Sequence, residues 1–367
     1  MRIGIDLHTI DGPYQGTVSL WTNMIGELSS ENEYILYSFN PQNTKTLFPE
    51  NHFSHCRIII KQPIIRIQYI FPYMVLRDKC DLLHMNYYGP LIGVSSLVLS
   101  IPDVIYLDFP DFSPGLRRMQ FSFLARHSAR AAKEIITISN YSKERIQHHF
   151  EISNDRIHVI PVSIGSSWLH PNENRIEEVW AQLKFKLPKR YILTVGRLDP
   201  RKNIPLAARV AKKLKKLDLV DGLVLIGPDD FGSQEIRRKF VEDKSENLVT
   251  HLKNLSTLEL QAIYRNASCL LFLSVAEGFG IPIIEAMAMG TPIVASNRTS
   301  IPEVCGNAGL IVDPDDEDAI ISATEKVITD SNLRTSIVMN GLNRISLFDP
   351  KKLALKLVNV YQIALNK

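Results

Sequence analysis

The chain has 367 residues, of which 45% are hydrophobic, 22% charged and 8% aromatic. This composition is typical of a globular protein with enough sequence for about two domains, and it excludes a short peptide ligand and a disordered regulator. The 42 Lys and Arg against 39 Asp and Glu leave a net charge of +3. That surplus is too small to hold the whole protein on nucleic acid, so we expect no nucleic-acid partner.

The amino-terminal residues, MRIGIDLHTID, turn polar after five positions, whereas a secretory signal needs an apolar stretch of about 7 to 15 residues. The longest apolar stretch, residues 91–107, is interrupted by three serines, a proline and an aspartate. It falls short of the roughly 20 residues that span a bilayer. We therefore expect a cytoplasmic protein without a transmembrane helix.

Short β-branched runs alternate with helical patterns along the whole chain, which predicts an α/β protein with parallel sheets flanked by helices. In the first half we expect helices at 16–28, 116–132 and 141–150. The strands expected in this half are 2–6, 34–39, 57–60, 81–85, 97–101, 134–138 and 157–160.

Strand patterns are lost between residues 161 and 188, where Gly165, Pro171 and Asn172 interrupt the chain, and a second series then begins at Tyr191. The strands expected in this series are 191–195, 222–226, 248–251, 269–273, 291–295 and 310–312. Two doubly wound domains of similar size follow. Ligands of such sheets bind outside the carboxyl ends of the strands, so we expect the chemistry in the loops after Val195, Leu273 and Ile101.

The segment SVAEGFGIPIIEAMAMGTPIV places a glycine-rich loop between a strand and a helix that begins near Pro282. The amino-terminal end of that helix attracts an anion, and Gly278 and Gly280 let the backbone approach it closely. Glu277 and Glu285 lie on either side of the helix start and can accept hydrogen bonds from hydroxyl groups. This combination indicates a ligand that carries both phosphate and polyol groups.

The segment GRLDPRKN, residues 196–203, follows a strand and precedes the helical pattern IPLAARVAKKL. It sets Arg197 and Lys202 beside a helix start, a suitable pair of cations for a diphosphate. Because both loops leave equivalent ends of one predicted sheet, we expect them to bind the same anion.

The four cysteines are far apart and form no C-x-x-C pair, so we expect neither a zinc site nor disulfides. Asp313-Pro314-Asp315 has the D-x-D spacing of a metal site, but it stands just before a helical pattern and is interpreted as a helix cap. We therefore expect no bound metal.

Two segments of the first half combine apolar and basic residues: residues 63–77, and residues 117–130 with their four arginines. Such a combination can rest on anionic lipid, or it can reflect core packing behind a solvated face. Peripheral contact with the cytoplasmic membrane leaflet and a purely structural role both stay open.

Taken together, these segments resemble the retaining glycosyltransferases of family 4. The spacing of Glu277 and Glu285 matches the E-x7-E motif of that family, and GRLDPRKN matches its G-R-x-x-x-x-K-N loop. Further agreement lies in DLLHMNYYGP, PDVIYLDFPDFSPG, ITISNYSKERI, RIHVIPVSI and SIPEVCGNAGLIVDP. The resemblance implies a GT-B fold, in which two Rossmann-like domains face each other across a cleft. The domains would be residues 1–165 on the acceptor side and 166–349 on the nucleotide-sugar side, with a helix at 350–367 crossing back to the first.

The same resemblance implies a role for each matching residue. Arg197 and Lys202 would neutralise the donor diphosphate, Glu285 would bind the ribose, and Glu277 would hold the transferred sugar with the amides of Phe279 and Gly280. Gly196, Gly278 and, in the first loop, Gly16 would complete the donor site. Asp103, after the strand at 97–101, is the catalytic candidate from the first domain.

Pro102 stands where the family commonly has a histidine that touches the donor sugar near its 6-position. Proline has neither a donor side chain nor a backbone N–H. The donor could be a 6-deoxy sugar such as rhamnose, Asp103 or His84 could replace the histidine, or the protein could have little activity.

The sequence thus predicts a metal-independent, retaining glycosyltransferase without a cofactor, acting on a nucleotide diphosphate sugar. The transferred group would be a hexose or 6-deoxyhexose (mannose- or rhamnose-like), and the acceptor a glycan or lipid-linked molecule in surface polysaccharide synthesis. A non-catalytic GT-B protein that binds nucleotide sugars is the alternative. A sugar-nucleotide epimerase on the same fold fits less well, because the Glu277–Glu285 spacing belongs to the transferases.

Overall fold

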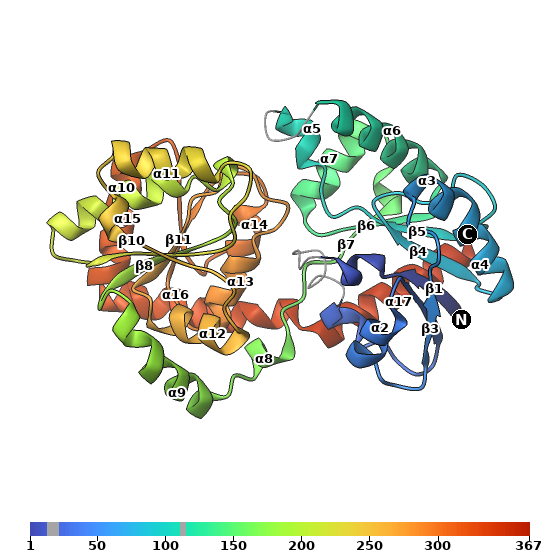
Figure 1. Cartoon of the computed structure of the whole chain (residues 1–367), viewed down its shortest axis with the longest axis horizontal. Helices are drawn as coiled ribbons and strands as arrows, with labels where there is room; N and C mark the ends of the chain where they lie inside the picture. The colour runs from blue at the N-terminus through green and yellow to red at the C-terminus, as the bar shows by residue number, and fades with distance from the viewer. Residues whose placement is uncertain (13–21, 111–114) are drawn as a thin grey trace. The chain divides into compact units, whose positions relative to one another are not determined.

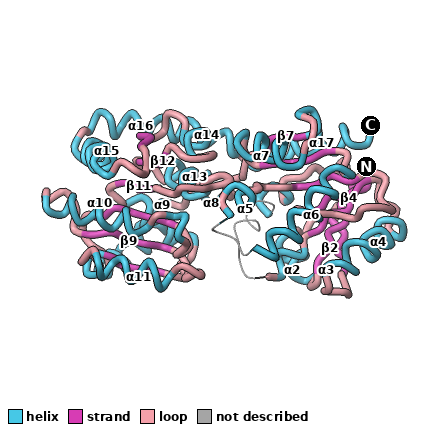
Figure 2. Tube along the Cα trace, turned by 90° about the horizontal axis from the view of Figure 1, so that it is seen from above, coloured by secondary structure: helices cyan, strands magenta, loops and turns pink. Residues whose placement is uncertain are grey.

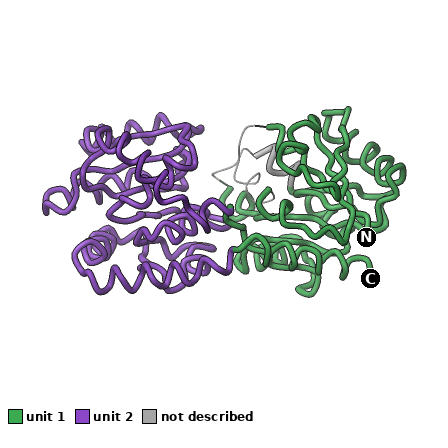
Figure 3. The backbone as a smooth tube through the Cα atoms, turned by 90° about the horizontal axis from the view of Figure 1, so that it is seen from below, with its two compact units in different colours: residues 1–165, 349–367 green, residues 166–348 purple. Residues whose placement is uncertain are grey.

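A computed structural model describes residues 1–12, 22–110 and 115–367, the side chains of 115–121 excepted. The chain forms two compact units, each with its own parallel sheet (Figure 3). Unit 1 comprises Met1–Gly165 and Asp349–Lys367, and unit 2 comprises Ser166–Phe348. Helices cover both faces of each sheet (Figures 1 and 2). The expected α/β class with two doubly wound sheets is confirmed.

The sheet of unit 1 has the strand order β3-β2-β1-β4-β5-β6-β7, and all its strands run parallel. Its strands are β1 (Arg2–Asp6), β2 (Glu33–Ser38), β3 (Phe53–Arg57), β4 (Leu82–Asn86), β5 (Leu97–Ser100), β6 (Glu134–Thr137) and β7 (Ile157–Val159). The α-helices of this unit include α2 (Pro41–Leu47), α3 (Pro63–Ile65), α4 (Phe71–Arg77), α5 (Ile105–Asp108), α6 (Gly115–Ala131), α7 (Asn140–Phe150) and α17 (Pro350–Asn366). Residues 22–25 are also helical, and residues 16–21 of the helix predicted at 16–28 lie outside the described residues. Strand order reverses between β1 and β4.

The sheet of unit 2 has the order β10-β9-β8-β11-β12-β13, again all parallel. Its strands are β8 (Tyr191–Val195), β9 (Gly222–Ile226), β10 (Val249–Leu252), β11 (Cys269–Phe272), β12 (Ile293–Ser296) and β13 (Leu310–Val312). Its α-helices are α8 (Ser166–Leu169), α9 (Glu173–Leu183), α10 (Ile204–Lys216), α11 (Ser233–Glu242), α12 (Thr257–Asn266), α13 (Ile281–Ala288), α14 (Ile301–Cys305), α15 (Glu317–Thr329) and α16 (Ser331–Arg344). Here the order reverses between β8 and β11.

One predicted strand is misplaced. A strand is predicted at residues 57–60, but β3 lies at Phe53–Arg57, with Phe53 opposite Tyr34 and Arg57 opposite Ser38. The ladder ends where the Ile58 amide donates to the Ser38 carbonyl, and Ile59 is 83% exposed. Apolar runs identify strands that are buried on both faces, whereas β3 lies at the sheet edge and needs no such run.

The last helix, α17, packs within unit 1 against β5 and β6. Its buried Tyr361 places its hydroxyl 2.8 Å from Nδ1 of His84, while Nε2 of His84 lies 2.7 Å from the Ser100 hydroxyl. Burial lowers the pKa of His84 to about 3. His84 is therefore a neutral core residue that holds α17, and it cannot replace the histidine missing at Pro102.

No disulfide joins the four cysteines. In the part of the chain that the structure describes, no helix combines the length and the apolar composition needed to cross a bilayer.

Removing the Tyr361 hydroxyl tests this attachment. Tyr361→Phe leaves a buried imidazole nitrogen without its partner, which should lower the free energy of unfolding by about 1–2 kcal/mol. Urea denaturation followed by circular dichroism measures the effect. Tyr73→Phe, which removes a hydroxyl from a side chain that is 61% exposed, should leave stability unchanged. Equal stability of the two variants would show that the His84 contact contributes nothing.

Candidate active site

Two loops meet at the point where strand order reverses in unit 2. β8 and β11 are neighbours, with Cys269 beside Ile192, and each ends in a loop at the carboxyl edge of the sheet. The loop after β8 carries GRLDPRKN and the loop after β11 carries SVAEGFG. The amide of Val275 in the second loop donates to the Arg201 carbonyl in the first, at 2.8 Å. Open α/β sheets bind their ligands at such a reversal.

A salt bridge links the two loops. Nζ of Lys202 lies 2.5 Å from Oε1 of Glu277, and both side chains are about nine-tenths buried. The same ammonium group lies 5.5 Å from the centre of the Phe272 ring. Burial opposes the ionisation of Glu277, but the charges of Lys202 and Arg201 outweigh it and hold the pKa of the carboxyl below its usual value. Both predicted residues are thus charged and in contact.

The first loop is shaped around the Lys202 stem. Asp199 caps a short 3-10 turn, Pro200–Lys202, by accepting from the Arg201 amide, and the Arg201 guanidinium donates to the same carboxylate at 2.8 Å. Gly196 has a φ of +157°, and a Cβ there would lie 3.2 Å from Cε of Lys202. Gly196 therefore leaves room for the lysine to reach across to Glu277.

Three residues that sequence reasoning missed hold Glu277 in place. The Thr299 hydroxyl accepts from the Glu277 amide, and the Ser300 hydroxyl donates to the Glu277 carbonyl. Arg201 lies 3.9 Å from the second carboxylate oxygen. Thr299 and Ser300 come from the loop after β12, so only the strand order shows that they are near. Arg201 could have been suspected, because it precedes Lys202 in the same basic turn.

The helix α13 begins directly behind this loop. Gly280 stands at its start with a φ of +114°, a conformation that L side chains rarely adopt, and Pro282 occupies the first turn. The side chain of Phe279 is buried and packs edge-on against Phe348, with 5.7 Å between the two ring centres. Gly278 and Phe279 thus bring the backbone to the amino-terminal end of the helix, whose amides favour an anion.

Glu285 lies one turn into α13, beside the fully buried Tyr264. The Tyr264 hydroxyl donates to Oε2 of Glu285 at 2.7 Å. Burial raises the pKa of Glu285 to about 7, against a smaller opposing effect of this hydrogen bond. Near neutral pH only part of Glu285 is therefore ionised, and its bond to a polyol stays a prediction.

Arg197 lies differently from Lys202. Its side chain is 44% exposed, and its guanidinium is 3.4 Å from Asp230, in the loop after β9. An exposed arginine on a flexible stem can still swing to an anion, so its diphosphate role stays a prediction.

The remaining predicted residues belong to unit 1. Asp103 follows β5 and accepts a hydrogen bond from the amide of Ile105 at the start of α5. Pro102 is buried, and its carbonyl accepts from the Thr137 hydroxyl. Gly16 lies outside the residues that the structure describes.

The D-x-D segment does not cap a helix itself. Asp313 and Asp315 both form salt bridges with Arg298, at 2.8 and 2.6 Å, and the cap of α15 is the next residue, Asp316. Within residues 1–12, 22–110 and 115–367, no three His, Cys, Asp or Glu side chains are grouped so that they could hold a metal ion.

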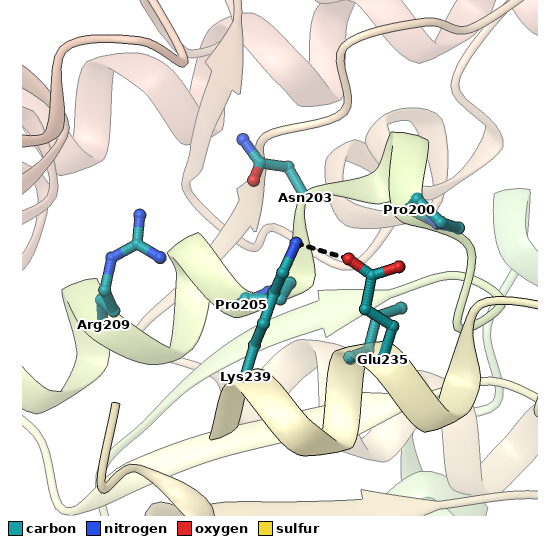
Figure 4. A pocket seen from close by; sticks show the side chains of 7 residues that line it. Pro200, Asn203, Pro205, Arg209, Glu235 and Lys239 are labelled. Atoms are coloured by element: carbon teal, nitrogen blue, oxygen red, sulfur yellow. Dashed lines mark ion pairs between the residues drawn. The ribbon is translucent and has the colours of Figure 1, made fainter. Parts of the chain in front are cut away.

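A hollow lies between α10 and α11, next to the loop that follows β8 (Figure 4). It is lined by Pro200, Asn203, Pro205, Arg209, Glu235, Ile236 and Lys239 and measures about 150 Å³. Glu235 and Lys239, one turn apart on α11, form a salt bridge at 3.0 Å on that side of the hollow. The hollow is smaller than the roughly 300 Å³ of small ligand sites, so a nucleotide sugar does not fit there.

Comparison with known proteins identifies the family. Residues 176–344 match the profile of the group 1 glycosyl transferases, and residues 34–164 match that of glycosyltransferase family 4. These two segments cover most of the chain, which belongs to the group 1, family 4 glycosyltransferases and has their GT-B fold.

Individual relatives agree with this assignment. O-antigen chain mannosyltransferase B of Escherichia coli is 28% identical over 78% of this chain and 76% of its own length. O-antigen chain mannosyltransferase RfbU of Salmonella typhimurium is 29% identical over 62% of this chain and 60% of its own. The structure of Anabaena HepE with UDP-glucose superposes with a TM-score of 0.74 and 18% identity, over 98% of both chains.

Lys202→Met tests the buried salt bridge. It leaves the Glu277 carboxylate without its closest cation, so the free energy of unfolding at pH 7 should fall by about 2–3 kcal/mol. Because the loss depends on an ionised Glu277, it should shrink as the pH drops below about 4.5. Denaturant titrations across this range measure both effects. Lys213→Met, an exposed lysine on α10, is the matched control, and an equal effect at every pH would contradict the assigned charges.

Glu285→Gln tests the raised pKa of Glu285. The folded protein keeps a proton on this carboxyl that the unfolded chain releases above about pH 4.5, so the wild-type protein loses stability as the pH rises to about 7. The glutamine variant lacks this loss and should gain about 1–3 kcal/mol relative to wild type between pH 4.5 and 8. Thermal denaturation over that range measures the difference. A constant difference would show an ordinary pKa.

Proposed function

We propose that this glycosyltransferase is a retaining, metal-independent enzyme that uses a nucleotide diphosphate sugar. The salt bridge between Lys202 and Glu277 at the start of α13 carries this proposal. It sets a cation for a diphosphate, a carboxylate for sugar hydroxyls and a helix amino terminus within one pair of loops. Few ligands other than a nucleotide diphosphate sugar need a cation, a carboxylate and a helix amino terminus together.

Each residue of the donor site has a task. Lys202 and Arg197 bind the diphosphate, aided by the backbone amides at the start of α13. Glu277, with the amides of Phe279 and Gly280, holds the hydroxyl groups of the transferred sugar, and Glu285 binds the ribose. Gly196, Gly278 and Gly16 leave room for the phosphates. The UDP-glucose that HepE holds supports a donor of this class.

The reaction we infer is a front-face substitution. The acceptor oxygen forms a bond to the anomeric carbon on the face from which the diphosphate oxygen departs, and the acceptor proton passes to the departing diphosphate. Lys202, Arg197 and the helix amides stabilise the negative charge that develops on the leaving group. Asp103 is the carboxylate from unit 1 that we assign to the acceptor side. These groups supply the charge that a metal ion provides in other transferases.

Mannose is our first candidate for the transferred sugar, and assembly of a bacterial surface polysaccharide is the setting. Two similar proteins are O-antigen chain mannosyltransferases. Pro102 favours a 6-deoxyhexose such as rhamnose as the second candidate, because it offers no hydrogen bond to a 6-hydroxyl. The acceptor would be a glycan or a lipid-linked sugar in the cytoplasm.

Pro102 also supports the rival function. A GT-B protein that has lost a donor contact could bind nucleotide sugars without transferring them and act as a regulatory subunit. Such a protein would keep the salt bridge and the helix start but would show no turnover.

A panel of UDP-, GDP- and dTDP-linked sugars, including 6-deoxy members, tests this proposal. We expect one donor to raise the melting temperature and to be hydrolysed slowly in the presence of EDTA. Glu277→Ala and Lys202→Ala should each reduce that hydrolysis about 100-fold or more. The exposed Lys213→Ala is the control.

The possible outcomes separate the two functions. Stabilisation by a donor without hydrolysis, even with added glycan or lipid-linked acceptors, would favour the non-catalytic protein. No binding of any sugar nucleotide would overturn both, and loss of activity with EDTA would refute metal independence.

A further inference from the structure

Unit 1 carries a helical segment with two apolar faces. It consists of α3, one π-helical turn at Arg66–Ile70, and α4, and runs from Pro63 to Arg77 without interruption. One face carries Ile67, Phe71, Met74 and Val75, which are buried in the core of unit 1. Burial of this face stabilises the segment against the core of unit 1. The opposite face does not pack in that core.

The opposite face is apolar and exposed. Ile65, Tyr69, Tyr73 and Leu76 follow one another at intervals of four, four and three residues and are 45, 70, 61 and 73% exposed. This spacing places them on one side of the helix. Most large apolar side chains of a soluble domain are covered, so a continuous exposed row of them indicates a surface that binds something.

A neighbouring loop extends the row. The amide of Leu91 donates to the Gln68 side chain at 3.1 Å, and Gly93 lies against Pro72, so the loop rests beside the helical segment. Leu91 and Ile92 are 42 and 79% exposed. We call these six side chains, Ile65, Tyr69, Tyr73, Leu76, Leu91 and Ile92, the outer face.

The charges around the outer face are positive. Residues 51–77 contain four Lys or Arg and no Asp or Glu, residues 78–81 contain Asp78, Lys79 and Asp81, and residues 82–102 contain none of these four residue types. Arg57, the last residue of β3, and Lys61, two residues before the segment, are both exposed. Arg77 lies 2.7 Å from Asp78, so the local surplus comes chiefly from Arg57 and Lys61.

We propose that the outer face docks on a bilayer that contains anionic phospholipid. Isoleucine, leucine and tyrosine beside exposed basic residues are the composition of helices that lie in the membrane interface, where tyrosine keeps its hydroxyl among the headgroups. Arg57 and Lys61 are attracted to the negative surface. A protein partner would have to supply a complementary acidic rim, whereas an anionic membrane supplies that charge everywhere.

The segment is also firmly attached to the sheet. Arg66, the first residue of the π-helical turn, is buried, donates to the Lys61 carbonyl, and lies 3.2 Å from Nε2 of His8. His8 in turn lies 2.8 Å from the Asp6 carboxylate at the end of β1. Docking therefore fixes the carboxyl edge of the sheet of unit 1 relative to the bilayer, close to where a lipid-linked acceptor is displayed.

The second basic group foreseen in the sequence contributes less. Arg126 and Arg130 on α6 lie 2.8 and 2.5 Å from opposite oxygens of the Glu151 carboxylate. This pairing offsets part of their positive charge. The side chains of Arg117 and Arg118 lie outside the described residues.

Vesicle flotation with the purified full-length chain tests this proposal. Wild-type protein should float with vesicles of phosphatidylcholine mixed with phosphatidylglycerol and bind those of phosphatidylcholine alone far less, with binding falling as salt rises. Tyr73→Ser/Leu76→Ser should weaken binding about tenfold or more. Arg57→Glu/Lys61→Glu should weaken it only on the anionic vesicles.

Matched variants control for side-chain type. Leu355→Ser removes a leucine that is 70% exposed on α17, and Lys213→Glu/Lys216→Glu reverses two exposed lysines on α10. Both should bind vesicles as wild type does, and the melting temperatures of all variants should agree. The assay needs no donor or turnover, so its outcome is independent of the proposed function.

Two results would overturn the proposal. One is wild-type protein that fails to float with anionic vesicles, or serine variants that bind as well as wild type. The other is a dimer in light scattering that Tyr73→Ser/Leu76→Ser dissociates while no vesicle binding occurs. That second result would assign the outer face to self-association.

Discussion

A buried salt bridge at the reversal point of the second sheet determines how the site is organised. Removing Lys202 and Glu277 from water costs free energy, which is recovered only if the two charges stay in close contact. The turn capped by Asp199, the small Gly196 and the hydroxyl groups of Thr299 and Ser300 all serve that contact.

The two sheets carry different side chains at the point where their strand order reverses. In each unit the strand order reverses once, and polar residues gather where two neighbouring strands end and diverge. Unit 2 places a salt bridge and a helix amino terminus there, which suits an anionic donor. Unit 1 places Asp6 and His8 there, linked to Arg66, and its last helix is held by the buried pair of Tyr361 and His84. Charge and hydrogen bonding, rather than the fold, distinguish the two edges.

Most strands were predictable because a parallel strand that is buried on both faces has a short, nearly continuous apolar sequence. β3 was not, because this edge strand has the largely polar sequence FSHCR, while the apolar run that follows it lies outside the ladder. The loops with Glu277 and Lys202 were found because glycines and a proline must mark a tight turn into a helix. Thr299, Ser300 and Tyr264 were missed, since ordinary residues far away in sequence carry no local signal.

The sequence by itself determined the fold class, the family and the two loops that meet at the candidate site. These depend on periodicity and on short motifs, which are local properties of the chain. Only the tertiary structure decided that Lys202 meets Glu277 while Arg197 pairs with Asp230, and that His84 is a core residue. It also decided that the D-x-D carboxylates bind Arg298 and that a row of apolar side chains stays uncovered. Burial and charge pairing join residues that are distant in the chain, so they are settled only when the sheets assemble.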